Sequence, residues 1–65
     1  MGSQLTARER EVLRLLGEGL ANKAIANRLA VSDVTVKSHL SKVFRKLGVS
    51  NRLQAIRVVV EGGGL

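Results

Sequence analysis

Apolar side chains recur along most of the chain at intervals of three and four positions, the spacing that lays an apolar stripe along one side of an α-helix. Near the start, Thr6 and Glu9 have the spacing of a capping box, in which each side chain bonds the backbone N–H group of the other residue. A first helix is therefore predicted over residues 7–17, ended by Gly17 and Gly19. Its apolar stripe consists of Val12, Leu13, Leu15 and Leu16.

The next two apolar stretches predict helices over residues 22–29 and 33–47. Only residues 30–32 separate them. Such a short turn with an apolar residue inside it, here Val31, is typical of a helix-turn-helix. Ser32 has the side chain needed to cap the helix that follows.

A fourth helix is predicted over residues 51–61, with Ser50 or Asn51 as its cap. This helix is more apolar than one buried stripe requires. The residues expected to face the core are Ala55, Ile56 and Val59, which leaves Leu53, Arg57 and Val60 on a second side. That second side is interpreted either as a dimer interface or as a helix end packed on its own core. The predicted fold is all-α, a four-helix helix-turn-helix domain.

Composition narrows the class of protein. The chain has 65 residues, enough for one domain, and it has no cysteine and one histidine, so neither a disulfide framework nor a thiolate metal site is expected. No apolar run approaches the roughly 20 residues of a membrane span, and no signal-peptide core opens the chain. We expect a soluble, cytoplasmic protein in which residues 1–4 are a linker or a remnant of cloning, residues 5–61 are the domain and residues 62–65 are a flexible tail.

The net charge is +6, from 11 Lys and Arg against 5 Asp and Glu. Charges of opposite sign cancel at both ends of the chain, and the basic excess lies over residues 23–52. A local basic excess favours a polyanionic partner over an evenly solvated surface.

The helix over residues 33–47 has an apolar face for the core and an opposite face rich in basic and hydroxyl side chains. The major groove of DNA admits one α-helix. This second face is therefore expected to contact base edges, while the residues beside it contact phosphates. The start of the helix over residues 22–29 is counted among the candidate phosphate contacts, because free backbone N–H groups at a helix start attract anions. The candidate base contacts are Val34, Lys37, Ser38 and Ser41. The candidate phosphate contacts are Asn22, Lys23, Thr35, His39, Lys42, Arg45 and Lys46.

Enzymatic chemistry is not expected. No acid-base pair, nucleophile with a partner or phosphate-binding glycine loop is visible, so neither a cofactor nor a metal is predicted. His39, at the rim of the apolar face, is interpreted as packed or phosphate-contacting rather than catalytic. Two alternatives to DNA binding remain. One is a protein-interaction module that works through residues 51–61. The other is non-specific RNA binding, which is disfavoured because Phe44 is the only aromatic residue for base stacking.

Several motifs, in this order and spacing, resemble the LuxR/NarL/FixJ family of GerE-like C-terminal effector domains, and the resemblance covers residues 5–61. The motifs are Leu5-Thr6-Ala7-Arg8-Glu9-Arg10-Glu11-Val12-Leu13, Asn22-Lys23-Ala24-Ile25-Ala26, Thr35-Val36-Lys37-Ser38-His39 and Lys46-Leu47-Gly48-Val49. The resemblance implies a four-helix fold in which the third helix recognises DNA and the fourth commonly mediates dimerisation.

The same resemblance implies bacterial transcription control at the nucleoid, in a response regulator of a two-component system or in a quorum-sensing regulator. It also implies an N-terminal receiver or autoinducer-binding domain, and it makes RNA polymerase a candidate partner. Members usually open the second helix with Ser-Asn-Lys-Glu, whereas Ala21 and Ala24 stand here at both ends of that capping box. Either Asn22 caps this helix instead or the helix start frays. Ser38 and Ser41 offer only short hydroxyls at variable base-contacting positions, so the operator sequence stays open.

Overall fold

The computed structural model describes residues 5–62 and contains four helices and no strand within that range. The helices are α1 (Ala7–Gly17), α2 (Asn22–Leu29), α3 (Asp33–Leu47) and α4 (Arg52–Glu61). The predicted all-α fold and the bounds of the first three helices are confirmed. Helix α4 begins one residue later than predicted, because residue 51 is its cap. The expectations for residues 1–4 and 63–65 lie outside the described residues, and Gly62, expected as the first residue of a tail, is the C-cap of α4.

Side chains cap the starts of α1, α3 and α4. In the predicted capping box of α1, Thr6 Oγ1 accepts from the backbone N–H of Glu9 at 3.1 Å, and Glu9 Oε1 accepts from the backbone N–H of Thr6 at 3.0 Å. Ser32 caps α3, and Asn51 rather than Ser50 caps α4. These local hydrogen bonds fix where each helix begins.

Helix α2 starts differently. Its N-cap residue, Ala21, provides no side-chain hydrogen bond, and Asn22 already belongs to the helix. The interpretation that Asn22 caps α2 is therefore wrong, because the Asn22 side chain is bonded to α4 instead. The first backbone N–H groups of α2 are left without a side-chain cap.

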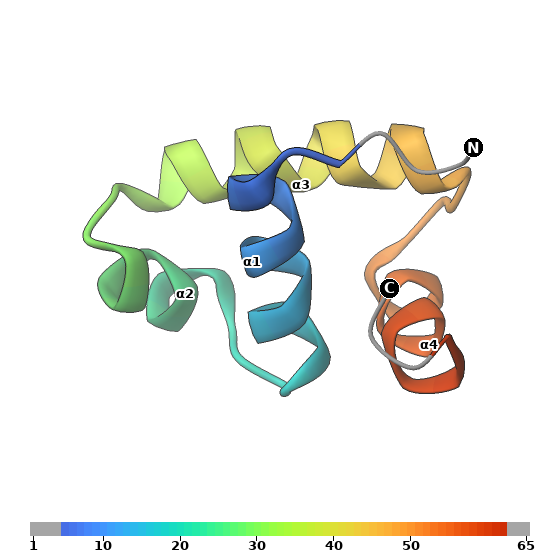
Figure 1. The fold of residues 1–65 in the computed structure, drawn as a ribbon. Helices are drawn as coiled ribbons and strands as arrows, with labels where there is room; N and C mark the ends of the chain where they lie inside the picture. Colours follow the sequence, from blue (N-terminus) through green and yellow to red (C-terminus); the bar gives the residue numbers. More distant parts are fainter. Residues whose placement is uncertain (1–4, 63–65) are drawn as a thin grey trace.

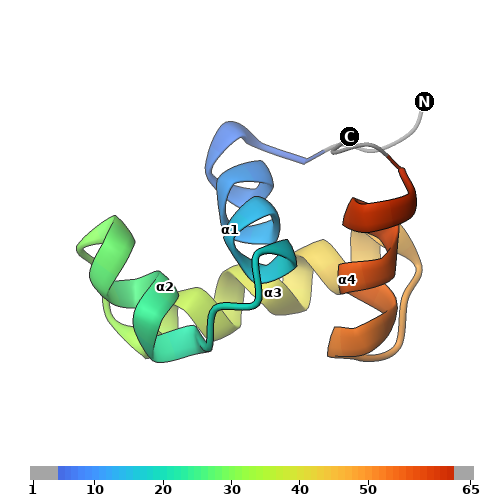
Figure 2. The same cartoon turned by 90° about the horizontal axis from the view of Figure 1, so that it is seen from below.

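Helix α1 occupies the middle of the molecule. In Figures 1 and 2, α3 runs along one edge, α2 and α4 lie near its two ends, and α1 stands between them. Accordingly α1 contacts each of the other three helices, and α2 also packs on α3. The apolar stripe of α1 therefore forms the centre of the core. The largest fully buried side chains are Val12, Leu13, Leu15, Leu16, Ile25, Val36 and Val43.

The contact between α1 and α4 depends on glycine at position 17, which has no side chain. A Cβ atom at Gly17 would lie 2.6 Å from Cγ1 of Val59, well inside van der Waals contact. Glycine at this position therefore lets α4 pack directly on the last turn of α1. As predicted, the inward residues of α4 meet the core: Ala55 is buried, while Ile56 and Val59 are half-buried and packed against it.

The turn of the helix-turn-helix is built from Ala30, Val31 and Ser32. Val31 is half-buried against the core, and its backbone N–H donates to the carbonyl oxygen of Ala26 at 3.0 Å. Ala30 is the C-cap of α2 in the left-handed conformation, with φ of 60° and ψ of 42°. It is the only residue other than glycine with a positive φ among those described. This backbone conformation disfavours a side chain.

Replacing Ala30 with glycine is expected to raise the free energy of unfolding by about 0.5–1 kcal/mol, because the left-handed strain on an L-residue, roughly 1–2 kcal/mol, exceeds the extra chain entropy of glycine. Urea unfolding followed by circular dichroism measures the change. Ala24→Gly is the matched control: residue 24 is exposed inside α2, and the same change there should cost about 1 kcal/mol. A loss of stability in both variants would show that Ala30 is not strained.

Candidate nucleic-acid interface

The two faces of α3 separate as the sequence predicts. Val36, Leu40 and Val43 are buried against the rest of the domain. On the opposite side, Val34 is 72% exposed, and Lys37, Ser38 and Ser41 are exposed as well. These four residues, called here the base strip, lie at positions that share one helix face. Their side chains form no hydrogen bond or ion pair with any residue that the structure describes, so they are available to a partner.

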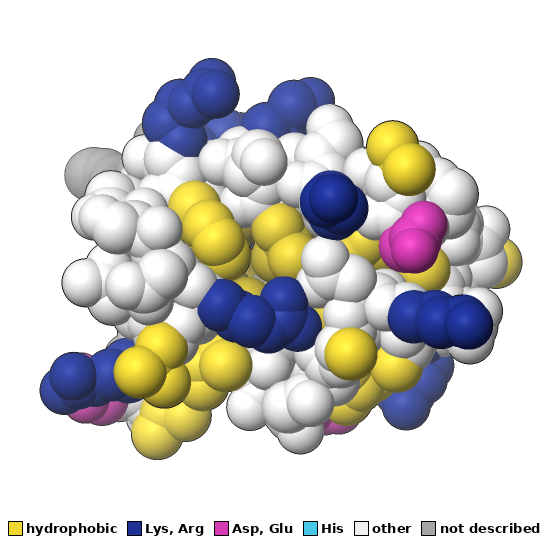
Figure 3. Space-filling model, turned by 180° about the vertical axis from the view of Figure 1, so that it is seen from behind, with side chains coloured by type: hydrophobic (Ala, Val, Ile, Leu, Met, Phe, Trp, Pro, Cys, Tyr) yellow, Lys and Arg dark blue, Asp and Glu magenta, His cyan; other side chains and the backbone are white. Residues whose placement is uncertain are grey.

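Basic side chains flank the base strip. Lys42 and Arg45 on α3 and Lys23 on α2 are exposed, and none of them forms an ion pair within residues 5–62. Figure 3 shows the side of the molecule opposite to that of Figure 1, on which most charged side chains are Lys or Arg, with hydrophobic side chains visible between them. Such a surface attracts a polyanion.

Three of the candidate phosphate contacts, Asn22, Thr35 and His39, are less exposed. Thr35 is half-buried, and its hydroxyl lies 3.0 Å from the Ser32 hydroxyl as part of the α3 cap. His39 is half-buried at the rim of the core, as the sequence suggests. Thr35 and His39 lie next to the exposed face of α3, so either can approach a phosphate only at the edge of that face.

Lys46 has a structural partner that the sequence analysis did not anticipate. Its Nζ atom donates to Glu9 Oε1 at 2.8 Å, and the Glu9 side chain is only 5% exposed against 32% for Lys46. The hydrogen bond from Lys46, then that from the Thr6 backbone, lower the pKa of the Glu9 carboxyl, and burial opposes them in part. Glu9 is therefore the ionised partner of a lysine that ties the last turn of α3 to the start of α1.

Arg52 is a second residue that the sequence analysis missed. From the first turn of α4, its Nη1 donates to Asn22 Oδ1 at 2.8 Å, and its Nη2 donates to the carbonyl oxygen of Leu20 at 2.7 Å. One signal could have indicated this role. A cation in the first turn of a helix faces the positive end of the helix dipole, so its presence there points to acceptors elsewhere in the fold.

A hollow of about 190 Å³ lies beside the base strip, where α2, α3 and α4 meet. Its polar lining can donate hydrogen bonds and includes no carboxylate, and its apolar lining comes from α3. The lining residues are Asn22, Lys37, Leu40, Ser41, Phe44 and Arg52. The hollow is thus suited to an anionic group attached to a less polar one.

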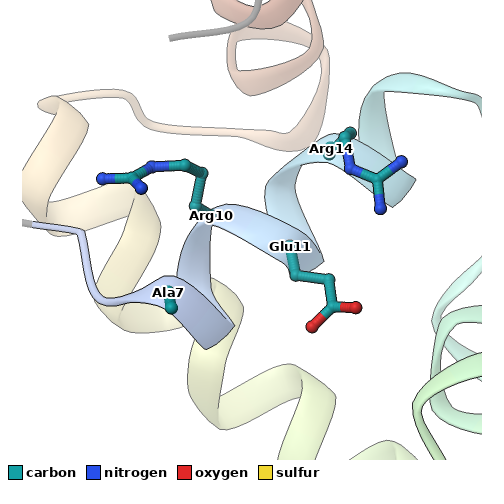
Figure 4. A pocket seen from close by; sticks show the side chains of 4 residues that line it. All are labelled: Ala7, Arg10, Glu11 and Arg14. Atoms are coloured by element: carbon teal, nitrogen blue, oxygen red, sulfur yellow. The ribbon is translucent and has the colours of Figure 1, made fainter.

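The larger hollow, of about 330 Å³, is lined by Ala7, Arg10, Glu11 and Arg14 on α1. Figure 4 shows that Arg10, Glu11 and Arg14 point in different directions, so they do not converge on one ligand. Glu11 is already paired with Arg8 at 3.7 Å, and Arg14 with Glu18 at 3.5 Å. Despite its size, this hollow is open surface on a single helix and does not define the functional site.

The second side of α4 is exposed. Leu53 and Val60 are each 68% exposed, and Arg57 between them pairs with Glu61 at 3.1 Å. The interpretation that Leu53 and Val60 pack on the domain's own core is therefore wrong. Within residues 5–62, no group of three or more His, Asp or Glu residues could hold a metal ion, and no helix is long and apolar enough to cross a membrane.

The fold and these surfaces agree with comparisons to known proteins. Residues 3–59 match the model of the GerE family, described as bacterial regulatory proteins of the luxR family. The DNA-binding transcriptional activator DevR/DosR of Mycobacterium tuberculosis is 49% identical over 53 residues, which are 82% of this chain and 24% of that protein.

Two solved structures are similar over nearly the whole chain. The structure of the response regulator ChrA, from a heme-sensing two-component system, has a TM-score of 0.86 and 40% identity, covering 100% of this chain and 32% of ChrA. The structure of the transcription factor GerE has a TM-score of 0.81 and 44% identity, covering 97% of this chain and 94% of GerE.

The chain spans between 6% and 29% of the length of the curated relatives that it matches first. The likeness is therefore to one domain of those proteins. Together, the helix-turn-helix, the open basic face of α3 and these matches show that the chain belongs to the luxR family of bacterial regulatory proteins, as a DNA-binding helix-turn-helix domain of transcriptional regulators.

Proposed function

We propose that this chain is the output domain with which a bacterial transcriptional regulator reads a specific DNA sequence, and that α3 is its recognition helix. The observation that carries the proposal is the base strip: Val34, Lys37, Ser38 and Ser41 are exposed and have no side-chain partner in the described fold. In the major groove, Lys37 and the two serines would hydrogen-bond base edges, and Val34 would contact a thymine methyl group.

Phosphate contacts would hold α3 in place. Lys23, Lys42 and Arg45 are best suited, because they are exposed and unpaired in the described structure. Asn22, Thr35 and His39 are half-buried and would approach phosphates from the edge of the interface. Lys46 would contribute less to phosphate binding than Lys42, since its ammonium group already forms an ion pair with Glu9.

A dimer is the proposed working form. One domain of this size would bury only about 600–1,000 Å² on DNA, whereas two copies could bind half-sites about one helical turn apart. The exposed side of α4, formed by Leu53, Arg57 and Val60, is the proposed interface between the copies. Two large apolar side chains left in solvent support this choice.

The whole regulator would contain more than this domain, since the curated relatives are several times longer. ChrA is a response regulator, which supports a receiver domain N-terminal to this one and a place in a two-component system. An autoinducer-binding domain, as in a quorum-sensing regulator, is the other arrangement. DevR/DosR is a transcriptional activator, and by analogy RNA polymerase would be a further partner at the cytoplasmic nucleoid.

Selection of bound sequences from random duplex DNA tests this function and supplies an operator. Lys37→Ala is then expected to lower affinity for that operator about 5- to 100-fold, the range for one base contact, and to lower affinity for random DNA much less. Lys23→Ala is the matched control, because loss of a phosphate contact should weaken both complexes by the same factor and reduce the salt slope by about 1. Failure of the selection to enrich any sequence would contradict the proposed function.

A further inference from the structure

Resting on the proposed function, we infer that Arg52 is a positioning residue for DNA binding. Its guanidinium group holds the side-chain amide of Asn22 so that the amide nitrogen donates to the sugar-phosphate backbone of the DNA in the hollow between α2 and α3. Arg52 thereby gives α4 a part in the interface by acting through Asn22, because two of its guanidinium nitrogens are already bonded within the protein.

The first support is the geometry of Arg52. Two nitrogens of one planar guanidinium group bond two acceptors, Asn22 Oδ1 at 2.8 Å and the carbonyl oxygen of Leu20 at 2.7 Å. Both acceptors lie at the entrance to α2, about 30 residues from Arg52 along the chain. This arrangement fixes both the backbone that leads into α2 and the rotation of the Asn22 side chain.

The second support is the orientation that this bond gives to Asn22. Because the amide oxygen accepts from Arg52, the amide nitrogen is left as the donor end. No residue within 5–62 accepts a hydrogen bond from that nitrogen, although the side chain is half-buried. Without Arg52 the amide could rotate and present its oxygen, which would repel a phosphate.

The third support is the hollow that Asn22 and Arg52 both line. Its polar lining consists of donors from Asn22, Lys37, Ser41 and Arg52, and its apolar lining consists of Leu40 and Phe44. A phosphodiester needs hydrogen-bond donors, and the deoxyribose beside it tolerates an apolar surface. The hollow also adjoins the base strip, since Lys37 and Ser41 belong to both. The backbone of the duplex read by α3 is therefore the occupant that fits.

A double-mutant cycle with Asn22→Ala and Arg52→Met on the selected operator tests the inference. Each single substitution is expected to weaken binding about three- to tenfold, the effect of one hydrogen bond. The double variant should bind no more weakly than Asn22→Ala alone, because Arg52 acts through Asn22. The dependence of affinity on salt should keep its slope, since the lost contact is made by a neutral amide.

Two further variants separate geometry from charge. Arg52→Lys keeps the charge but not the planar fork, so it should behave like Arg52→Met. Arg14→Met removes an exposed arginine from α1, and its affinity should stay within about twofold of the unchanged chain. Thermal unfolding checks that each variant is folded, and if Arg52→Met is not, the cycle is run with Arg52→Lys.

Two results would overturn the inference. Multiplied losses in the double variant would show that Arg52 acts independently of Asn22. Restored binding in Arg52→Lys, with a salt slope reduced by about 1 in Arg52→Met, would show that Arg52 contacts phosphate directly. A chain that prefers no sequence would instead contradict the proposed function, so the two failures are distinguishable.

Discussion

A variant with Lys37, Lys42 and Arg45 all replaced by alanine is expected to bind its operator about 300- to 6,000-fold more weakly at 0.1 M salt. Lys42 and Arg45 each lose a phosphate contact and the release of condensed counterions that goes with it, which is worth nearly a factor of ten per contact at this salt concentration, and Lys37 loses a base contact. The slope of log K against log salt should become shallower by about 2, because two phosphate contacts are lost. Fluorescence anisotropy with a labelled duplex, repeated at several salt concentrations, measures both quantities.

The matched control removes the same number of charges from α1. Arg8, Arg10 and Arg14 are all exposed, and Arg8 and Arg14 form surface ion pairs with Glu11 and Glu18. Replacing these three arginines with alanine should weaken binding only slightly, because only long-range attraction is reduced. Equal losses in the two triple variants would mean that net charge, and not the face of α3, determines affinity.

Leu16→Ala is expected to lower the free energy of unfolding by about 3–5 kcal/mol and the Tm by more than about 12 °C. Leu16 is 0% exposed on α1, the helix that contacts all three others, so the cavity left by the substitution lies at the centre of the core. A domain of this size has only about 3–10 kcal/mol of stability in total. The variant should therefore be largely unfolded in thermal or urea unfolding experiments.

Leu53→Ala is the matched control for this loss. The chemical change is the same, but Leu53 is 68% exposed on α4, so the fold should lose less than about 0.5 kcal/mol. If α4 forms the dimer interface, sedimentation velocity should instead show weaker self-association. A large loss of stability in Leu53→Ala would indicate that this side chain packs on its own domain in solution.

The helix bounds could be predicted because the signals that set them are local. The Thr6–Glu9 capping box and the Ser32 cap each act within three residues, so the sequence alone shows them. The base strip could be predicted equally well, because helical periodicity separates its positions from those of the core face. The α4 surface was predicted only as two alternatives, because periodicity shows that a side is apolar but not what covers it.

The contacts that join distant parts of the chain could not be predicted in this way. Lys46 and Glu9 are 37 positions apart, and Arg52 and Asn22 are 30 positions apart. Whether such side chains meet depends on how the helices pack, which no local pattern encodes. For Glu9 the sequence does give an indication of burial. Glu9 precedes Val12 and Leu13 by three and four positions, so it lies on the same helix face as the apolar stripe. Of the two alternatives for the start of α2, the one in which Asn22 caps the helix is wrong for the same reason, since the partner of Asn22 comes from α4.

The four side chains of the base strip are exposed and form no hydrogen bond or ion pair with another of residues 5–62. Substitutions there can exchange one recognised DNA sequence for another while the scaffold keeps its stability. Natural divergence and laboratory retargeting can therefore proceed by single steps at these positions, without compensating changes in the core. A library randomised at residues 34, 37, 38 and 41 should consequently yield mostly folded proteins with many different sequence preferences.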